Sequence, residues 1–393
     1  MRSVPSVALL IETSSAYSRG LLHGIASYLR DHWPWSIHLT ECDRGKPAPS
    51  WFRRWKGDGV IARIENASIA KLVQELNRPT VDMSAAQLIP SLPWVETDDA
   101  AVARLSAEHL LGRGFRHFAF FGDDRYNWSR WREENFTRLI RERGFDCSVC
   151  NTPDVRNQDS KAVLKKVRAW IGRLPRPLAV MASHDFHGLL ILDVCRRIGI
   201  SVPDEVAVIG VDNDEVLCEL SSPPMSSVIP NTYRTGYLAA ALLDRMMAGE
   251  RLQYESHRIE PLGVAARQST DVLAIDDENI VKVVRFIREH ACEGINMKDV
   301  LKVVPESRRM LESRFRKLVG RTPHEEIVRV QLDRVKTLLA ESELSLERIA
   351  VQAGFRHTEY LSVVFREKMG MPPSRFRALN QQKRRGEACK ILK

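Results

Sequence analysis

The chain has 393 residues, of which 44% are hydrophobic and 28% are charged, a composition that is typical of a globular protein and argues against disorder. No apolar run approaches the ~18 residues that a membrane span requires. The net charge of +9 is uneven, because residues 281–393 carry 25 Lys and Arg against 14 Asp and Glu, whereas the first 280 residues have a net charge of −2. Such an excess is often only a solvated face, but it also suits the phosphate backbone of a nucleic acid.

The N-terminus and the cysteines point to a cytoplasmic protein. Residues 1–12 contain one basic residue, a proline and an acidic residue that closes a short apolar run, which predicts a first β-strand and not a signal peptide. The seven cysteines are scattered and odd in number, as expected of reduced thiols. Cys147 and Cys150 form a C-x-x-C, but on a strand their side chains would point to opposite faces. His184 and His187 could share a helix face and bind a metal, although surface or site-lining roles fit them better, so neither a metal nor a cofactor is predicted.

Up to about residue 270 the sequence alternates short apolar runs with segments of helical periodicity. This alternation predicts parallel, doubly wound α/β sheets, and nine strands suit two sheets better than one. The predicted strands are Val7–Glu12, Ser36–Thr40, Gly59–Ala62, Thr80–Met83, His117–Phe121, Asp146–Cys150, Leu178–Ala182, Val206–Val211 and Ser226–Ile229. The predicted helices include Arg19–Leu29, Ala100–Leu111, Trp131–Arg143, Val163–Ile171, His187–Ile198 and Tyr233–Met247.

Polar residues follow several of these strands, where ligands of doubly wound folds bind. Glu12 ends the first strand, Asp185 comes shortly after the seventh, and Asp212 ends the eighth. Arg132 opens the helix after the fifth strand. Carboxylates and a forked arginine make strong hydrogen bonds to hydroxyl groups, so these residues are suited to binding a sugar. Glu12 facing solvent and Asp212 acting as a turn or helix-capping residue remain structural alternatives.

Aromatic residues near the same strand ends add to this hypothesis. Tyr17, Trp128 and Phe186 could stack on the apolar face of a sugar ring. Phe186 could equally belong to the hydrophobic core.

Four motifs in this first part are Gly112-x-Gly114-Phe-Arg116-His-Phe-Ala-Phe-Phe121-Gly122, Gly199-Ile-Ser-Val-Pro203-Asp, Val208-Ile-Gly210-Val-Asp212-Asn213 and Arg267-Gln-Ser269-Thr270. They resemble the periplasmic-binding-protein-like effector domain of LacI-type regulators. The resemblance implies two lobes with a ligand cleft between them, and it places Arg132, Asp185 and Asp212 at sugar-contacting positions. The expected ligand-binding residues are Glu12, Tyr17, Arg19, Trp128, Arg132, Asp185, Phe186 and Asp212.

A break in periodicity separates this part from the basic part of the chain. It predicts a linker at residues 271–278, after a ligand-binding domain at 1–270. An amphipathic helix then resumes at residues 278–290, and it opens a predicted DNA-binding domain at 279–380. Residues 381–393 are expected to form a basic tail.

Two helix-turn-helix patterns follow in this basic part. The first lies between Met297 and Phe315 and is interrupted at Pro305, and the second starts at the helix-capping residue Ser345 and turns at Gly354. The residues predicted to face inward are Val300, Leu301, Val304, Met310, Leu311 and Phe315 in the first unit and Leu346, Ile349, Ala350, Tyr360, Leu361, Val364 and Phe365 in the second.

Both units lie within one longer pattern of residues. It consists of Ser307, Leu311, Phe315, Gly320-Arg-Thr-Pro323, Leu332, Leu339, Ile349-Ala350, Gly354-Phe355, Tyr360-Leu361, Phe365, Gly370, Pro373 and Phe376-Arg377. It resembles the AraC/XylS-type DNA-binding domain over about a hundred residues, against the alternative of an unrelated helical bundle. Two positions depart from that family, because Pro305 stands where glycine is usual and Val363 where many members carry a polar residue that reads bases. The expected DNA-binding residues are Ser307, Arg308, Arg309, Glu312, Ser313, Arg316, His357, Thr358, Glu359, Ser362 and Val363.

The predicted fold class is therefore α/β plus all-α, with a two-lobed doubly wound domain followed by a helical domain with two helix-turn-helix units. The two resemblances predict a sequence-specific transcription regulator of a carbohydrate operon, in which xylose or another pentose binds between the lobes and alters DNA binding. Double-stranded DNA, the sugar and a second copy in a homodimer are the expected partners, RNA polymerase is a further candidate, and no membrane contact is expected.

Other classes of protein fit the sequence less well. An enzyme is not expected, because no G-x-x-x-x-G-K-[ST], no G-x-G-x-x-G after a strand and no G-x-S-x-G is present. A transport-type binding protein would leave the basic part unexplained. A regulator that responds to another small molecule or to a protein partner remains the alternative.

Overall fold

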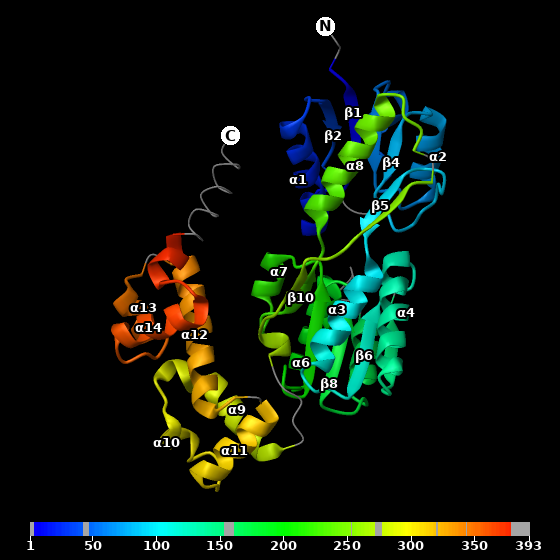
Figure 1. Ribbon diagram of the computed structural model, residues 1–393. Helices are drawn as coiled ribbons and strands as arrows, with labels where there is room; N and C mark the ends of the chain where they lie inside the picture. Colours follow the sequence, from blue (N-terminus) through cyan, green and yellow to red (C-terminus); the bar gives the residue numbers. More distant parts are fainter. Residues whose placement is uncertain are drawn as a thin grey trace. The chain divides into compact units, whose positions relative to one another are not determined.

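The computed structural model describes residues 4–41, 47–152, 161–252, 254–271, 277–319, 321–342 and 344–378. The chain divides into two compact units, Met1–Ala274 and Ile275–Lys393. The first unit consists of two α/β lobes and the second consists of helices (Figure 1). Residues 272–276 of the predicted linker and the predicted tail at 381–393 lie outside the described residues.

The first lobe is built on a sheet of parallel strands in the order β11-β5-β4-β3-β1-β2. Successive side chains of β1 point to opposite faces, so that Val7 and Leu9 pack with α1 and α8 whereas Ala8 and Leu10 pack with α2. The elements are β1 Ser6–Leu10, α1 Ala16–Asp31, β2 Ser36–Leu39, η1 Ser50–Arg54, β3 Gly59–Ala62, α2 Ala67–Leu76, β4 Thr80–Asp82, β5 Trp94–Thr97, α8 Thr232–Met247 and β11 Ser256–Ile259.

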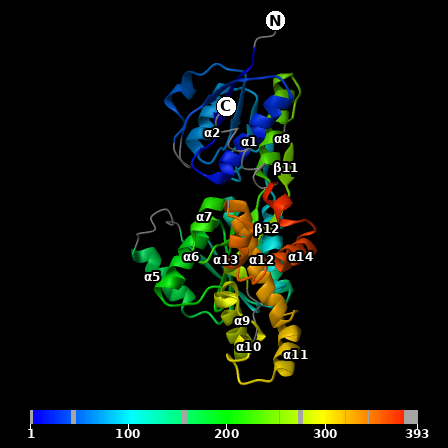
Figure 2. The same ribbon diagram turned by 90° about the vertical axis from the view of Figure 1, so that its left-hand side faces the viewer.

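Helices α1 and α8 lie side by side in this lobe and approach each other through glycines (Figure 1, Figure 2). A Cβ atom on Gly24 would lie 2.1 Å from the carbonyl oxygen of Tyr233, and one on Gly236 would lie 2.0 Å from that of Leu21. Larger side chains would therefore force the helices apart. Tyr28 also donates a hydrogen bond of 2.9 Å to Asp244, which is 216 positions further along the chain.

The second lobe has the strand order β12-β10-β9-β8-β6-β7, in which β12 pairs antiparallel with β10 and the other strands are parallel. One face packs against α3 and α4 and the other against α5 and α6, so the sheet is doubly wound. The elements are α3 Asp99–Leu111, β6 His117–Gly122, α4 Asn127–Glu142, β7 Cys147–Asn151, α5 Lys161–Ile171, β8 Leu178–Ala182, α6 Asp185–Arg197, β9 Val206–Val211, α7 Glu215–Leu220, β10 Ser226–Ile229, β12 Gly263–Ala265 and η2 Gln268–Thr270.

The chain passes between the two sheets at three places. These are residues 97–99 after β5, residues 229–232 after β10 and residues 259–263 after β11 (Figure 1). Each lobe is therefore assembled from segments that are distant in sequence, and the three connections form the hinge region between the lobes.

The structure confirms two doubly wound sheets, and four strands have the predicted bounds: β3, β8, β9 and β10. Three further strands, β5, β11 and β12, were not predicted. They are only three or four residues long, and β11 has the sequence Ser-His-Arg-Ile, with only Ile259 buried. β11 and β12 lie at the edges of their sheets, whereas β5 lies between β11 and β4. Strands this short carry too few residues for a recognisable hydrophobic pattern.

The second unit is helical and contains both predicted helix-turn-helix units. Its apolar core lies between the long helix α12 and the helices α13 and α14. None of the helices in the described ranges combines the length and apolar character of a membrane span. The elements are α9 Glu278–His290, η3 Ala291–Glu293, α10 Met297–Val300, α11 Arg308–Val319, α12 Pro323–Glu341, α13 Leu346–Gln352 and α14 Thr358–Met369, and residues 373–378 are also helical.

Two residues predicted to face inward in this unit are exposed instead. Met310 is 56% exposed and Tyr360 is 47% exposed. Each lies one position before a buried leucine, Leu311 or Leu361, and is therefore rotated by roughly 100° away from the apolar stripe. The inward prediction was wrong because a short helix buries one narrow stripe, which in α11 recurs every four residues.

A buried carboxylate, Glu326, holds α12 to its surroundings. It is an acceptor for Arg321, and it accepts hydrogen bonds of 3.0 and 2.9 Å from Arg329, while Arg288 of α9 lies at 3.7 Å. Burial alone would raise the pKa of Glu326, but the bonds from Arg329 and the charges of the three arginines lower it to about 2. The ionised carboxylate thus links α9 and α12.

Candidate functional site

Arg132, in the first turns of α4, is the best-defined polar group of the second lobe. It is only 4% exposed, its Nε donates to Asp99 Oδ1 at 2.6 Å, and its Nη1 donates to the carbonyl oxygen of Ser183 at 2.5 Å. The guanidinium carbon lies 5.0 Å from the centre of the Trp128 ring. No protein acceptor engages Nη2 in the part of the chain that the structure describes. The guanidinium is therefore fixed in orientation with one nitrogen left for a ligand.

Asp99, the partner of Arg132, was not predicted from the sequence. It begins α3 immediately after the first connection between the lobes. Burial raises its pKa to about 7, although the charge of Arg132 opposes this shift. In the sequence, Asp98 and Asp99 carry the signal of a helix start, and Asp98 does cap α3. Because a helix start already accounts for both aspartates, nothing in the sequence indicated that Asp99 also binds Arg132.

The first lobe contributes an ion-paired cluster around Arg63, which was also not predicted. Arg63 Nη1 donates to Glu12 at 2.5 Å and Nη2 donates to Glu65 at 3.0 Å, and the guanidinium lies 5.2 Å from the Tyr17 ring. Glu12 is 5% exposed, so the alternative that it faces solvent does not hold. Glu12 and Tyr17 therefore lie together, as predicted, with Arg63 between them.

Tyr17 and Glu96 connect this cluster to the hinge. The Tyr17 hydroxyl donates to Glu96 and lies 3.0 Å from the hydroxyl of Thr97. Burial, followed by the charge of Glu96, raises the pKa of Tyr17 well above its usual value, so that the phenol stays protonated. The charge of Arg132 in turn acts on Glu96, which means that the polar groups of the two lobes are close enough to interact.

Asp185 and Asp212 lie at neighbouring strand ends of the second lobe, but they differ in role. Asp185 is buried and accepts from Ser227 at 2.7 Å and from the amide of Asp214 at 2.8 Å. Burial, and next the charge of Asp212, raise the pKa of Asp185 well above its usual value. Asp185 therefore fixes the loop that carries Asp212, instead of offering a free carboxylate.

Asp212 adopts a left-handed backbone conformation, with φ 104°, at the end of β9. Aspartate and asparagine tolerate positive φ better than most residues. Asp212 is half-buried, and its charge acts on both Arg132 and Asp99. The structure thus brings Arg132, Asp99 and Asp212 into one polar group.

Of the remaining predicted ligand residues, Trp128 lies against this group, because the Arg132 guanidinium carbon is 5.0 Å from the centre of its ring. Phe186 is 45% exposed, so it does not belong to the core, and Trp128 is buried and stacks on Tyr126 with the ring centres 5.4 Å apart. Arg19 is exposed and donates to the carbonyl oxygens of Thr13 and Ser14.

The cysteines and histidines that the sequence singled out, Cys147, Cys150, His184 and His187, lie in the second lobe. Cys147 and Cys150 pack on opposite faces of the second sheet, as predicted. His187 is buried beside Ser183, and burial lowers its pKa to about 3. Within the described ranges no group of three or more His, Cys, Asp or Glu residues could hold a metal ion.

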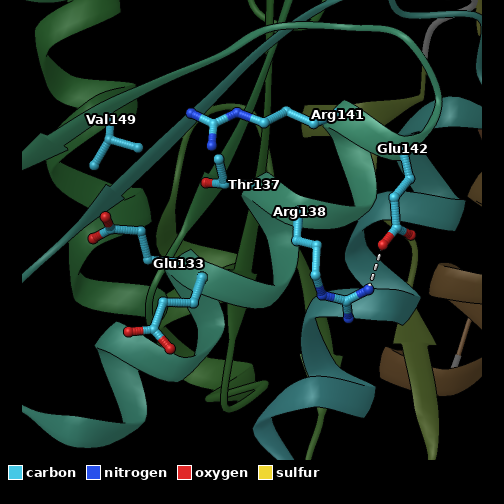
Figure 3. Close-up of a pocket in the computed structure, with 7 residues that line it drawn as sticks. Glu133, Thr137, Arg138, Arg141, Glu142 and Val149 are labelled. Carbon is cyan, nitrogen blue, oxygen red and sulfur yellow. Dashed lines mark hydrogen bonds and ion pairs between the residues drawn. The ribbon is translucent and has the colours of Figure 1, made fainter.

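A separate hollow of about 630 Å³ lies on another face of α4, beside β7. Figure 3 shows that charged side chains of both signs line it. Arg138 forms an ion pair of 2.7 Å with Glu142 there. It contains none of the predicted ligand residues.

In the helical unit, most of the predicted DNA-binding residues are exposed. A hollow of about 500 Å³ is lined by Arg308, Arg309, Glu312, Ser313, Arg316 and Thr322, and Arg308 pairs with Glu312 at 2.8 Å. Of the residues predicted for α11 and α14, those that are exposed are Ser307, Arg308, Arg309, Ser313, Arg316, His357, Glu359 and Val363, and those that are half-buried are Glu312, Thr358 and Ser362.

Comparisons with known proteins agree with both units. An XylR N-terminal domain matches residues 6–100, a periplasmic binding protein-like domain matches residues 107–270, and a helix-turn-helix domain matches residues 302–379. The structure of a xylose-binding transcription activator, xylR, covers 96% of this chain and 99% of its own, with a TM-score of 0.77 and 29% identity. The structure of a LacI family regulator from Enterococcus faecium with bound ribose covers 69% of this chain and 99% of its own, with a TM-score of 0.55 and 19% identity. At this identity the similarity is one of fold alone.

The fold and the three matched domains define a transcription regulator in which a two-lobed, periplasmic-binding-protein-like domain is joined to a helix-turn-helix domain. The chain is 30% identical to the xylose operon regulatory protein of Escherichia coli over 384 residues, which is 96% of this chain and 97% of that protein. It is 28% identical to the protein of the same name from Haemophilus influenzae over 379 residues, which is 94% of this chain and 97% of that protein. The chain belongs to the family of xylose operon regulatory proteins.

Proposed function

We propose that this protein is a cytoplasmic regulator of a pentose catabolic operon, and not an enzyme. Residues 1–270 bind the sugar between the two lobes, and residues 279–380 bind double-stranded DNA. Xylose is the first candidate ligand, because the relatives that match the whole chain are named for it. The hydrogen bonding of Arg132 is the observation that carries the proposal. Two nitrogens of its buried guanidinium are fixed by the protein, and the third is available to donate a hydrogen bond to a sugar hydroxyl group.

We further propose that the protein acts as a homodimer. Helices α11 and α14 of one chain read two segments of the major groove, and a second copy reads a related half-site. Xylose binding changes how the pair of helical units is presented to DNA, which alters the contact with RNA polymerase.

DNA binding is expected to depend strongly on salt. The logarithm of the affinity of the full-length protein for a duplex selected from random-sequence DNA should fall linearly with the logarithm of the salt concentration, with a slope of about −0.9 for each phosphate neutralised.

Arg309→Ala should reduce the free energy of DNA binding by ~1–3 kcal/mol. Footprinting should show weaker protection in one of two groove segments about one helical turn apart. Lys282→Ala removes the same charge from an exposed site on α9 and should leave the footprint intact. A footprint unchanged by Arg309→Ala would assign α11 a structural role only.

Asp212→Asn is expected to weaken xylose binding by roughly 10- to 100-fold, because a charged acceptor is replaced by a neutral one. Asparagine keeps the size of the side chain and tolerates the positive φ at this position, so the loop should stay in place. Calorimetry with xylose, arabinose, ribose and glucose measures the effect on the full-length protein. Equal binding by the wild type and Asp212→Asn would remove Asp212 from the site.

The same titrations decide between the proposal and its alternative. If the wild type binds none of the four sugars, a different small molecule or a protein partner is the effector, and only the DNA-binding half of the proposal remains.

A further inference from the structure

The last residues of the first unit are fixed to α3. Thr270 is fully buried, and its hydroxyl lies 2.8 Å from His109 Nε2 and 2.7 Å from the hydroxyl of Ser226. Its carbonyl oxygen accepts a hydrogen bond of 2.6 Å from Arg113 Nε. His109 lies in the last turn of α3 and Arg113 lies just beyond it. The chain therefore leaves the ligand-binding domain from a point that is clamped to the C-terminal end of this helix.

The N-terminal end of the same helix lies at the candidate ligand site. α3 begins at Asp99, which holds Arg132, and it has 13 residues, so the two ends are about 18 Å apart. Asp99 also follows directly after the first connection between the lobes. A change in lobe orientation caused by a sugar would therefore move α3 and, with it, the clamp on Thr270.

The first described residue of the second unit is fixed to a DNA-reading helix. Asp277 caps α9, with Oδ1 accepting from the amide of Ile280 at 3.3 Å, and its Oδ2 accepts from Arg314 Nη2. Arg314 lies in the middle of α11, 37 positions further along the chain, and its Nη1 donates to Glu306 at 2.5 Å. Although burial acts to raise the pKa of Asp277, the bond from Arg314 lowers it, so the carboxylate is ionised and the pair is a true ion pair.

Resting on the proposed function, we propose that Asp277 and Arg314 are a positioning pair that couples the sugar site to DNA reading. The connection between the domains is anchored at Thr270 to the helix that starts at the sugar site, and at Asp277 to the helix that reads DNA. The cap that Asp277 provides would hold α9 without Arg314, so the ion pair adds a link from the connection to α11. Breaking this link should uncouple the two sites while leaving each able to bind.

Asp277→Asn tests the proposal, because asparagine is as good a helix cap as aspartate but cannot form the ion pair. The ratio of DNA affinities with and without saturating D-xylose is measured for the full-length protein on a selected duplex. In the wild type this ratio is expected to lie between about 5 and 150, or its inverse. In Asp277→Asn it should move toward 1 by ~2- to 30-fold, while the affinity of the DNA-free protein for xylose stays unchanged.

Asp333→Asn is the matched control. Asp333 lies on α12 of the same unit, pairs with Arg329 and Lys336, and loses the same charge on substitution, but it has no contact with Asp277 or Arg314 among the described residues. The ratio of its DNA affinities with and without D-xylose should equal that of the wild type.

Thr270→Val tests the other anchor. It removes the hydrogen bonds of the Thr270 hydroxyl and leaves the bond from Arg113 to the carbonyl oxygen, and it should also move the ratio of DNA affinities toward 1.

The outcomes separate this inference from the proposed function. If xylose changes DNA binding of the wild type and of Asp277→Asn by the same factor, the pair is purely structural and the inference fails alone. The same holds if the variant loses affinity equally with and without xylose. If xylose does not bind the wild type or does not change its DNA affinity, the proposed function fails and the inference fails with it.

Discussion

Replacing Arg132 with alanine is expected to abolish measurable xylose binding, with a loss of at least ~3 kcal/mol or more than about 100-fold in affinity. The substitution removes the donor that we propose binds the sugar, and it also leaves the buried Asp99 carboxylate and the Ser183 carbonyl oxygen without their partner. Calorimetry on the full-length protein measures the affinity directly. A thermal shift supports it, because a hundredfold excess of ligand over Kd stabilises the wild type by ~2.7 kcal/mol and should not stabilise the variant.

Arg138→Ala on the same helix is the control for this experiment. Arg138 is exposed and pairs with Glu142 in the outer hollow of α4 (Figure 3). Its loss should leave xylose affinity unchanged, because exposed pairs contribute little and none of the predicted ligand residues lines that hollow. Retained DNA binding by Arg132→Ala would show that the helical unit is intact. Wild-type xylose affinity in Arg132→Ala would contradict the assignment of the site.

Glu326→Gln is expected to destabilise the helical unit by ~3–5 kcal/mol at pH 7, because it leaves three arginines around a buried neutral group. Amide hydrogen exchange in α9 and α12 of the full-length protein reads the stability of this unit separately from that of the lobes. Asp333→Asn breaks exposed ion pairs on the same helix and should change stability by less than ~1 kcal/mol.

The effect of Glu326 should also depend on pH in a defined window. Its pKa is lowered from 4.5 to about 2 in the folded protein, so its contribution is fully present above the unfolded pKa and is lost as the pH falls toward the folded one. A shift of this size corresponds to ~3 kcal/mol. The difference between the wild type and Glu326→Gln should therefore narrow between pH 4.5 and pH 2. A difference that stays constant over this window would show that lost packing, and not the charge, causes the destabilisation.

The sequence was sufficient for much of the fold because periodicity is a local signal. The amphipathic pattern at residues 278–290 predicted a helix with the same bounds as α9. Apolar runs likewise predicted strands with the same bounds as β3, β8 and β9. Met310 and Tyr360 show the limit of that signal, since in a short helix a single position decides between the inside and the surface. Strands β5, β11 and β12 are defined by their neighbours in the sheet, which the sequence does not name.

The candidate site divides in the same way. Glu12 and Arg132 were accessible to prediction because each lies close to a recognisable element, Glu12 just after β1 and Arg132 in α4. The predicted start of that helix was wrong, because α4 begins at Asn127 and Arg132 lies in its second turn. Arg63 and Asp99 were not, because each is defined by a partner 51 or 33 positions away. Asp185 lies where it was predicted, yet only its bonds to Ser227 and Asp214 reveal that the protein itself satisfies its carboxylate.

The close packing of α1 on α8 has a consequence for synthesis of the chain on the ribosome. Tyr28 and the glycine face of α1 emerge early, but Asp244 and Gly236 are translated about 200 residues later. At 5–20 residues per second the apolar face of α1 waits on the order of 10 to 40 s for its partner. The second lobe lies within that interval of sequence except for β12 and η2, so most of it can fold before α8 completes the packing of the N-terminal lobe. Slowing translation between α1 and α8 should therefore prolong exposure of the first lobe to chaperones and proteases without affecting the second.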